Sequence, residues 1–160
     1  MSIRNAVAGL SLMLFAAGAM AQERPPYGPA IGMELAAKIA AGATAESKKN
    51  GWRMATAIVD NHGLLVYFER MDDTQTASVQ VAIDKAQAAA MYRRPTKAFQ
   101  DGVAGGGVGL RLLTLRGATA VEGGIPIMMG GKVIGAVGVS GANADEDAKA
   151  AVAGLKAAGL

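Results

Sequence analysis

The chain has 160 residues, of which 51% are apolar, 18% are charged and 4% are aromatic, and its formal net charge is +3. This charge is too small for a nucleic-acid-binding module that neutralises many phosphates, and the apolar fraction is too high for a disordered tail. The absence of cysteine excludes disulfides, a cysteine nucleophile, iron–sulfur clusters and cysteine-ligated zinc or haem. The lone His62 excludes a metal site built from several histidines.

Residues 1–21 are predicted to be a signal peptide that does not belong to the folded domain. Arg4 precedes the apolar run from Ala6 to Ala17, and Ala19 and Ala21 are small residues at the positions that a signal peptidase recognises. The alternative is an uncleaved membrane anchor, but this run is shorter than the roughly 20 residues that span a bilayer. We therefore expect cleavage before Gln22 and export, periplasmic or secreted, with no stable membrane insertion afterwards.

The remaining chain is predicted to form an extended N-terminal arm and one domain. Three prolines in residues 22–30 deny backbone hydrogen-bond donors to helix and sheet, which favours an extended arm. Residues 31–160 are predicted to form a single domain. Apolar residues recur at helical spacing after Ile31, and the Asn50-Gly51 pair supplies a stop for that helix.

Strands and further helices follow this first helix. A second helix is expected from Val79 to the turn before Pro95, a short third one from Thr96 to Asp101, and a last one capped by Asn143. The glycine-rich stretch 102–109 is predicted to be a mobile loop. Five strands are expected at residues 54–60, 64–70, 118–121, 125–129 and 132–140. This order indicates an α+β fold with a single five-stranded antiparallel sheet and helices packed on it.

Several short segments occur in an order and spacing that resemble a known family. They are Ile58-Val59-Asp60, Glu69-Arg70-Met71-Asp72, Lys85-Ala86, Arg94-Pro95-Thr96, Gly123-Gly124-Ile125-Pro126-Ile127 and residues 131–141, and the last is the most specific. Together they resemble the haem-binding GlcG/HbpS-type proteins, also called the haem-degrading domain family, over nearly all of the chain after residue 21. The resemblance implies a profilin-like or sensor-like fold, assembly into homo-oligomers and, in some relatives, haem binding.

One position departs from the family pattern. Relatives usually carry a histidine directly after the turn glycine, whereas this chain has Leu64 there and places His62 before Gly63. A shift of one residue in a hairpin changes the side of the sheet to which a side chain points. The departure puts the role of this imidazole in question.

A haem site needs apolar walls, cations for the propionates and usually an axial donor to the iron. His62 is a candidate iron ligand, although a solvated turn residue is the alternative. Tyr92 is a second candidate donor, and half-buried packing is its alternative. The other available donors are Tyr27, Tyr67 and the methionines at positions 33, 54, 71, 91, 128 and 129.

The clearest charge feature lies between residues 85 and 116. Six cations face one acid, Asp101, which is a local excess of 6 − 1 = +5; the cations are Lys85, Arg93, Arg94, Lys97, Arg111 and Arg116. Guanidinium groups match carboxylates with two hydrogen bonds, so this segment could hold a haem or a small organic acid. A solvated helix face or an oligomer rim is the alternative. The predicted ligand-binding residues are Arg70, Lys85, Tyr92, Arg94 and Thr96; Arg70 and Asp72 could instead form a structural ion pair with each other or with Lys85.

No nucleotide-binding or hydrolase motif was found. The glycines at 105, 107 and 109 do not follow a predicted strand, and Ser140 lacks the pattern of a nucleophile elbow. The main prediction is an exported haem- or tetrapyrrole-binding protein, active in haem storage, sensing or degradation. The alternative is a cofactor-free enzyme or accessory protein acting on a small organic acid, with Asp60, Asp72 or Lys85 transferring the proton. A third option is a structural or sensory partner protein.

Overall fold

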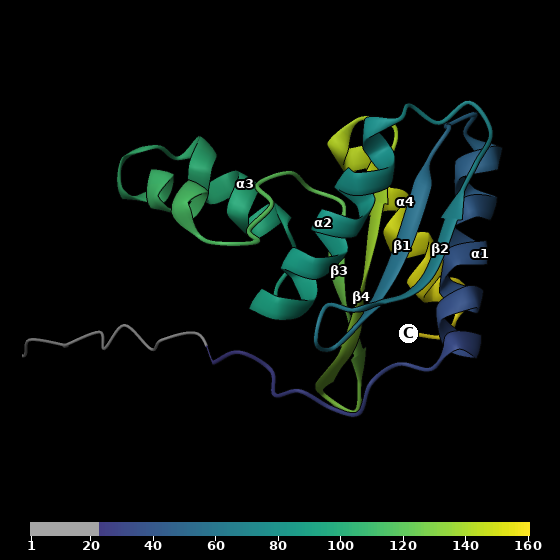
Figure 1. Ribbon diagram of the computed structural model, residues 1–160, viewed down its shortest axis with the longest axis horizontal. Helices are drawn as coiled ribbons and strands as arrows, with labels where there is room; N and C mark the ends of the chain where they lie inside the picture. Colours follow the sequence, from purple (N-terminus) through teal and green to yellow (C-terminus); the bar gives the residue numbers. More distant parts are fainter. Residues whose placement is uncertain (1–22) are drawn as a thin grey trace, which may run out of the picture.

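The computed structural model describes residues 23–160, and its centre is an antiparallel sheet of four strands in the order β2-β1-β4-β3 (Figure 1). The strands are β1 (Ala55–Asp60), β2 (Leu65–Arg70), β3 (Gly124–Met129) and β4 (Lys132–Ser140). Each hairpin joins neighbours in sequence, and the two hairpins meet where β1 pairs with β4. The α+β class with one antiparallel sheet is therefore confirmed.

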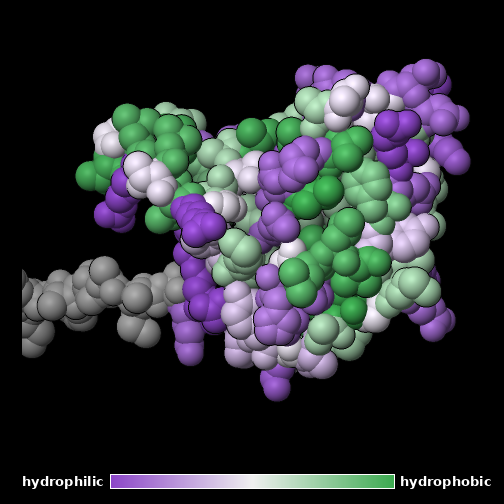
Figure 2. All heavy atoms as spheres, viewed as in Figure 1, coloured by the Kyte–Doolittle hydropathy of each residue, from purple (hydrophilic) through white to green (hydrophobic). Residues whose placement is uncertain are grey.

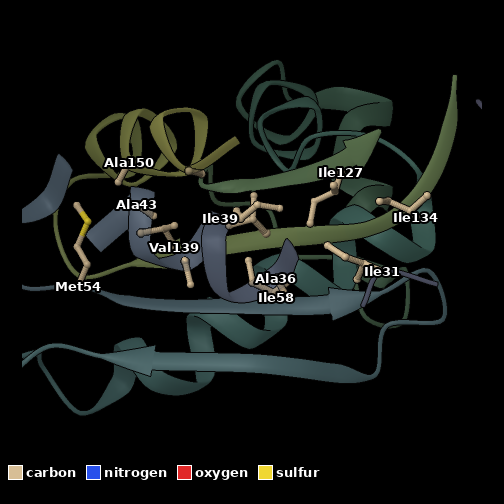
Figure 3. Packing of buried hydrophobic residues seen from close by; sticks show 13 residues of the cluster. Ile31, Ala36, Ile39, Ala43, Met54, Ile58, Ile127, Ile134, Val139 and Ala150 are labelled. Atoms are coloured by element: carbon tan, nitrogen blue, oxygen red, sulfur yellow. The ribbon is translucent and has the colours of Figure 1, made fainter. Parts of the chain in front are cut away.

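One face of the sheet is covered by α1 (Met33–Lys49) and α4 (Ala144–Ala157). Ile39 and Ala43 of α1 and Ala150 of α4 are fully buried against Ile58 and Val139 of the sheet (Figure 3). The two helices touch closely because position 154 is glycine: a Cβ there would lie 2.5 Å from the carbonyl oxygen of Ile39.

The opposite face is covered by α2 (Ala77–Tyr92). Its buried side is almost entirely alanine, and Ala82 and Ala86 lie directly over β4. A Cβ on Gly138 would collide with the carbonyl oxygen of Ala82 and lie 2.5 Å from the amide nitrogen of Ala86. The close approach of the α2 backbone to β4 therefore requires glycine at position 138.

The prediction of a mobile glycine loop at residues 102–109 is wrong. Residues 102–104 belong to α3 (Lys97–Ala104), and residues 107–109 begin the 3₁₀ helix η1 (Gly107–Thr114). The glycines allow α3 and η1 to pack closely. A Cβ on Gly102 would lie 2.5 Å from the side chain of Leu112, and a Cβ on Gly109 would collide with the carbonyl of Gly102. We call α3 and η1 together the knob, which projects from the body of the molecule (Figure 1).

The predicted strand at residues 118–121 is also wrong, so the sheet has four strands and not five. The backbone amides at the two ends of this segment bond to other partners. The amide of Ala118 donates to the carbonyl of Leu115 in a turn, and the amide of Glu122 donates to the side chain of Gln100. A strand needs its backbone groups for a neighbouring strand, and the amides at the two ends of this segment already have other partners.

The N-terminal segment lies beside the start of β4. The amide of Gly28 donates to the carbonyl of Val133, and the amide of Val133 donates to the carbonyl of Pro26, both at 2.9 Å. The predicted signal peptide, residues 1–21, lies outside the described residues. Among residues 23–160, no helix has the length and apolar character to cross a membrane.

Candidate functional site

A cavity of about 320 Å³ lies between the N-terminal segment, the end of α2 and strand β3. Three guanidinium groups line it, those of Arg24, Arg93 and Arg94, and Glu23 is the acid among its lining residues. The apolar part of its wall comes from prolines and from Ile125 and Met128 of β3. We call this cavity the arginine pocket.

The two adjacent arginines diverge because α2 ends in a left-handed turn at Arg93, whose φ is 53°. The guanidinium group of Arg93 lies over the ring of Tyr27, 5.1 Å from its centre, and donates to the carbonyl oxygen of Pro25 at 3.2 Å. Arg94 turns the other way, and its Cζ lies 4.1 Å from the ring centre of Phe99. Arg93 therefore binds the N-terminal segment to the end of α2, whereas Arg94 packs on the ring of Phe99.

Arg94 carries an unused hydrogen-bond donor. Its Nε is buried and has no partner within the described residues, and its guanidinium group forms no ion pair there. Burial lowers the pKa of Arg94, the nearby charge of Arg24 lowers it further, and Tyr92 opposes both effects. A buried, unpaired cationic donor is costly, and a bound carboxylate would relieve that cost with charge-assisted hydrogen bonds.

Thr96 and Tyr92, both predicted ligand-binding residues, lie two residues on either side of Arg94 in the chain, and neither lines the arginine pocket. Thr96 is fully buried: its Oγ1 accepts from the amide of Gly124, and its own amide donates to the carbonyl of Gly124, both at 2.9 Å. This exchange joins the segment after Arg94 to β3. The hydroxyl of Tyr92 donates to the carbonyl of Arg116 at 2.7 Å, and its ring meets Phe99 edge-on.

Lys85, another predicted ligand-binding residue, lies in the interior and does not line the arginine pocket. Its ammonium group donates to Asp147 Oδ2 at 2.7 Å and to the carbonyl of Val139 at 3.1 Å. Burial raises the pKa of Asp147, although the hydrogen bond from Lys85 opposes this. The pair joins α2 to α4 across the end of β4. Sequence reasoning missed this pairing, because no local pattern links Lys85 to a carboxylate 62 residues away.

Arg70 lies at the other end of the sheet. The pairing register sets Arg70 beside Ala55, which pairs with Ser140 at the end of β4, whereas Met128 of the arginine pocket pairs with Val133 near its beginning. Arg70 lines a separate polar cleft of about 410 Å³ that also contains Asp72. Arg70 and Asp72 form no ion pair within the described residues.

His62 lies exposed in the turn between β1 and β2. Its amide and that of Leu64 both donate to Asp60 Oδ1, at 2.8 and 2.9 Å, so the Asp60 carboxylate holds the turn. His62 does not line the arginine pocket. No group of three or more acidic or histidine side chains within residues 23–160 is arranged to hold a metal ion.

The structure brings two of the six cations of the basic segment, Arg93 and Arg94, to one pocket. Lys97 is paired with Asp101 at 2.7 Å, and Arg111 and Arg116 are exposed. Sequence reasoning missed Arg24, which completes the pocket from the N-terminal segment. Arg24 is far in sequence from the basic segment, and no sequence pattern indicated that the two come together in the fold.

Comparison with known proteins finds relatives of this sequence and fold. The family model described as "Haem degrading protein HbpS-like" matches residues 31–156. Protein GlcG of Escherichia coli strain K12 is 36% identical over 110 residues, which cover 69% of this chain and 81% of GlcG. A double mutant of Streptomyces reticuli HbpS superposes with a TM-score of 0.74 at 25% identity, covering 98% of this chain and 97% of HbpS. The crystal structure of a PduOC:heme complex gives a TM-score of 0.72 at 25% identity, with 80% and 94% covered.

Proposed function

This chain belongs to the HbpS-like family of haem-degrading proteins, as its sequence motifs predicted, and from that premise we propose that it binds haem or a related tetrapyrrole. The carboxylates of the ligand are held at the arginine pocket. One observation carries this assignment: Arg94 lines a pocket with an apolar wall and forms no ion pair within the described residues, where its Nε also lacks a hydrogen-bond partner. A relative, PduOC, has been crystallised as a haem complex.

The residues present suit the acidic edge of such a ligand. Arg24 and Arg94 supply positive charge for two propionates, and Ile125, Pro126 and Met128 supply apolar contact for the adjoining ring. Small-molecule sites usually enclose roughly 300–1,000 Å³, so a cavity of about 320 Å³ would leave part of the macrocycle outside. Bound haem would supply the iron chemistry on which storage, sensing or degradation depends.

The iron donor is a separate proposal. Met128 lines the pocket and offers a thioether, His62 is an exposed imidazole outside it, and the Tyr92 hydroxyl is engaged with Arg116. Spectra of haem-loaded Met128→Leu, His62→Ala and Tyr92→Phe distinguish these donors. Loss of the wild-type Soret band position in one variant identifies that side chain.

The proposal is tested by titrating the purified chain with hemin and following the Soret band. Removing a charged hydrogen bond costs about 1.5–3 kcal/mol, so Arg94→Gln should weaken binding by about 10- to 100-fold. The matched control is Arg70→Gln, an arginine at the other end of the sheet, and it should bind as the wild type does. The absence of a Soret shift with the wild type, or equal affinity in Arg94→Gln, would contradict the assignment.

Export and self-association complete the proposal. Export rests on the composition of residues 1–21, and mass spectrometry of fractionated cells should find a chain that begins at Gln22 outside the cytoplasm. A full-length chain confined to the cytoplasm would contradict it. Self-association into a homo-oligomer is checked by sedimentation at micromolar concentration, and a monomer there would contradict it.

A small organic acid is the alternative ligand, since the same guanidinium groups would bind its carboxylate. An enzymatic role has less support, because Asp60, Asp72 and Lys85 do not line the arginine pocket. The two ligands are separated by competition: a small dicarboxylate that displaces hemin only at large excess supports the tetrapyrrole.

A further inference from the structure

The knob exposes large apolar side chains that nothing in the described chain covers. No residue of η1 is buried, and Phe99 is the one buried residue of α3. The exposed fractions are 82% for Val108, 50% for Leu110 and 64% for Leu113. Figure 2 shows this projecting part with a predominantly hydrophobic surface.

The knob has little stability of its own. Each of its two helices has eight residues, which is too short for a stable isolated helix in water. The two helices pack mainly on each other. Contiguous apolar surface on a soluble protein usually marks a contact with another molecule. The knob is therefore expected to be covered in the functional state.

The body carries a second exposed apolar surface, between α2 and β2. Leu65 is 51% exposed, and Phe68 and Ile83 are half-buried at the margin of the alanine-rich core. We call these three residues the strip. Figure 2 shows hydrophobic surface on the body between α2 and β2, on the side of the molecule where the knob is also in view. The strip is available because β2 is an edge strand.

The charges beside the two surfaces are opposite. Arg111 of the knob is exposed and forms no ion pair within residues 23–160. Asp84 follows Ile83 of the strip, and its carboxylate accepts a hydrogen bond from Gln80 at 2.7 Å but pairs with no cation in the described chain. Complementary charges fix the register in which two apolar surfaces meet.

We propose that the knob of one copy docks on the strip of a second copy, with Arg111 directed to Asp84 of the neighbour. This inference rests on the proposed self-association and adds to it the two surfaces that meet. The contact joins different surfaces of the two copies, so it can close into a ring or be made twice by a pair of chains that exchange knobs.

The chain has no cysteine, so introduced cysteines provide a test without background. The variant Leu65→Cys/Leu113→Cys, treated with a short bis-maleimide, should give covalent dimers and larger species. The matched control is Met33→Cys/Leu113→Cys, which moves the second thiol to α1 at a similarly exposed position and should stay uncross-linked. Cross-linking of Leu113→Cys alone, or equal cross-linking in the control, would overturn the proposal.

A second variant tests the same contact without cross-linking. Leu113→Asp should lower the sedimenting mass of the chain, whereas Met33→Asp should leave it unchanged; far-UV circular dichroism confirms that both remain folded. Retention of the wild-type mass in Leu113→Asp would overturn the proposal. If the wild type sediments as a monomer, both the proposed self-association and the proposed contact between knob and strip are wrong. If the wild type is an oligomer but Leu65→Cys/Leu113→Cys does not cross-link, only the proposed contact is wrong. Hemin titration of the same samples reports separately on the ligand proposal.

Discussion

The guanidinium group of Arg94 lies over the ring of Phe99, with Arg94 Cζ 4.1 Å from the ring centre. Phe99 is also the residue that anchors α3 to the body, because no other α3 residue is buried. A single contact thus orients the unpaired arginine of the pocket and holds the base of the knob. A planar cation over an aromatic face is stabilised by the ring quadrupole, and this geometry suits arginine better than lysine.

Phe99→Ala should therefore affect both stability and ligand binding. Truncating a fully buried phenylalanine costs about 3–5 kcal/mol of the free energy of unfolding, and Arg94 loses the ring that holds it in place. We expect weaker hemin binding under conditions where the variant is still folded. Met33→Ala, at an exposed site of α1, is the control and should change neither the stability of the chain nor its affinity for hemin. Denaturant unfolding and Soret titration measure the two effects.

Gly138→Ala should separate α2 from the sheet. The added Cβ would meet the carbonyl of Ala82 and the amide of Ala86, which are backbone groups and cannot move independently of the helix. Overpacking of this kind costs about 1–3 kcal/mol. Gly32→Ala is the matched control, because no atom lies within 4 Å of a Cβ at that position. Equal unfolding midpoints for the two variants would show that α2 does not need this close approach.

The buried pair of Lys85 and Asp147 predicts strongly non-additive mutations. Lys85→Met alone leaves a buried carboxylate without its cation and should cost about 3–5 kcal/mol. The double variant Lys85→Met/Asp147→Leu removes both charges and should recover most of that loss. Chemical denaturation of the wild type, the two single variants and the double variant gives the free energies of unfolding for a double-mutant cycle. A double variant as unstable as the sum of the single variants would contradict the account of this pair.

The raised pKa of Asp147 gives a pH dependence of known sign. Burial makes the folded chain hold this proton to a higher pH than the unfolded chain does. The contribution of this group to the free energy of unfolding therefore falls as the pH rises from about 3.8, the ordinary pKa of aspartate, to the raised pKa of Asp147. Above the raised pKa this contribution no longer changes with pH. Relative to Lys85→Met/Asp147→Leu, the wild type should lose stability across that window. A relative gain of stability with rising pH would contradict this sign.

The local features of the fold could be predicted from the sequence. The turn at residues 60–63 lies between β1 and β2, and the last helix begins where Asn143 and Glu146 indicate, with the amide of Asn143 donating to the Glu146 carboxylate at 3.0 Å. These features follow from periodicity and from residues within one turn of each other. The strand predicted at residues 118–121 is wrong: a turn and a side chain engage the amides of Ala118 and Glu122 at the two ends of the segment.

The candidate site was less accessible to sequence reasoning, because it depends on contacts between distant segments. Arg94 was identified from its charge and motif, but Arg24 reaches the pocket only because the N-terminal segment lies beside β4. Lys85 stood in the same basic segment, yet its partner Asp147 is 62 residues away. The glycines of residues 102–109 suggested a loop, whereas they allow α3 and η1 to touch.

The most direct test of the arginine pocket compares hemin with its dimethyl ester, in which both propionates are uncharged. If Arg24 and Arg94 hold those carboxylates, the wild type should bind hemin at least about tenfold more tightly than the ester, since each tenfold corresponds to about 1.4 kcal/mol. Arg94→Gln should show most of that preference lost. Equal affinity of the wild type for hemin and its ester would contradict the claim that this pocket recognises the acidic edge of a tetrapyrrole.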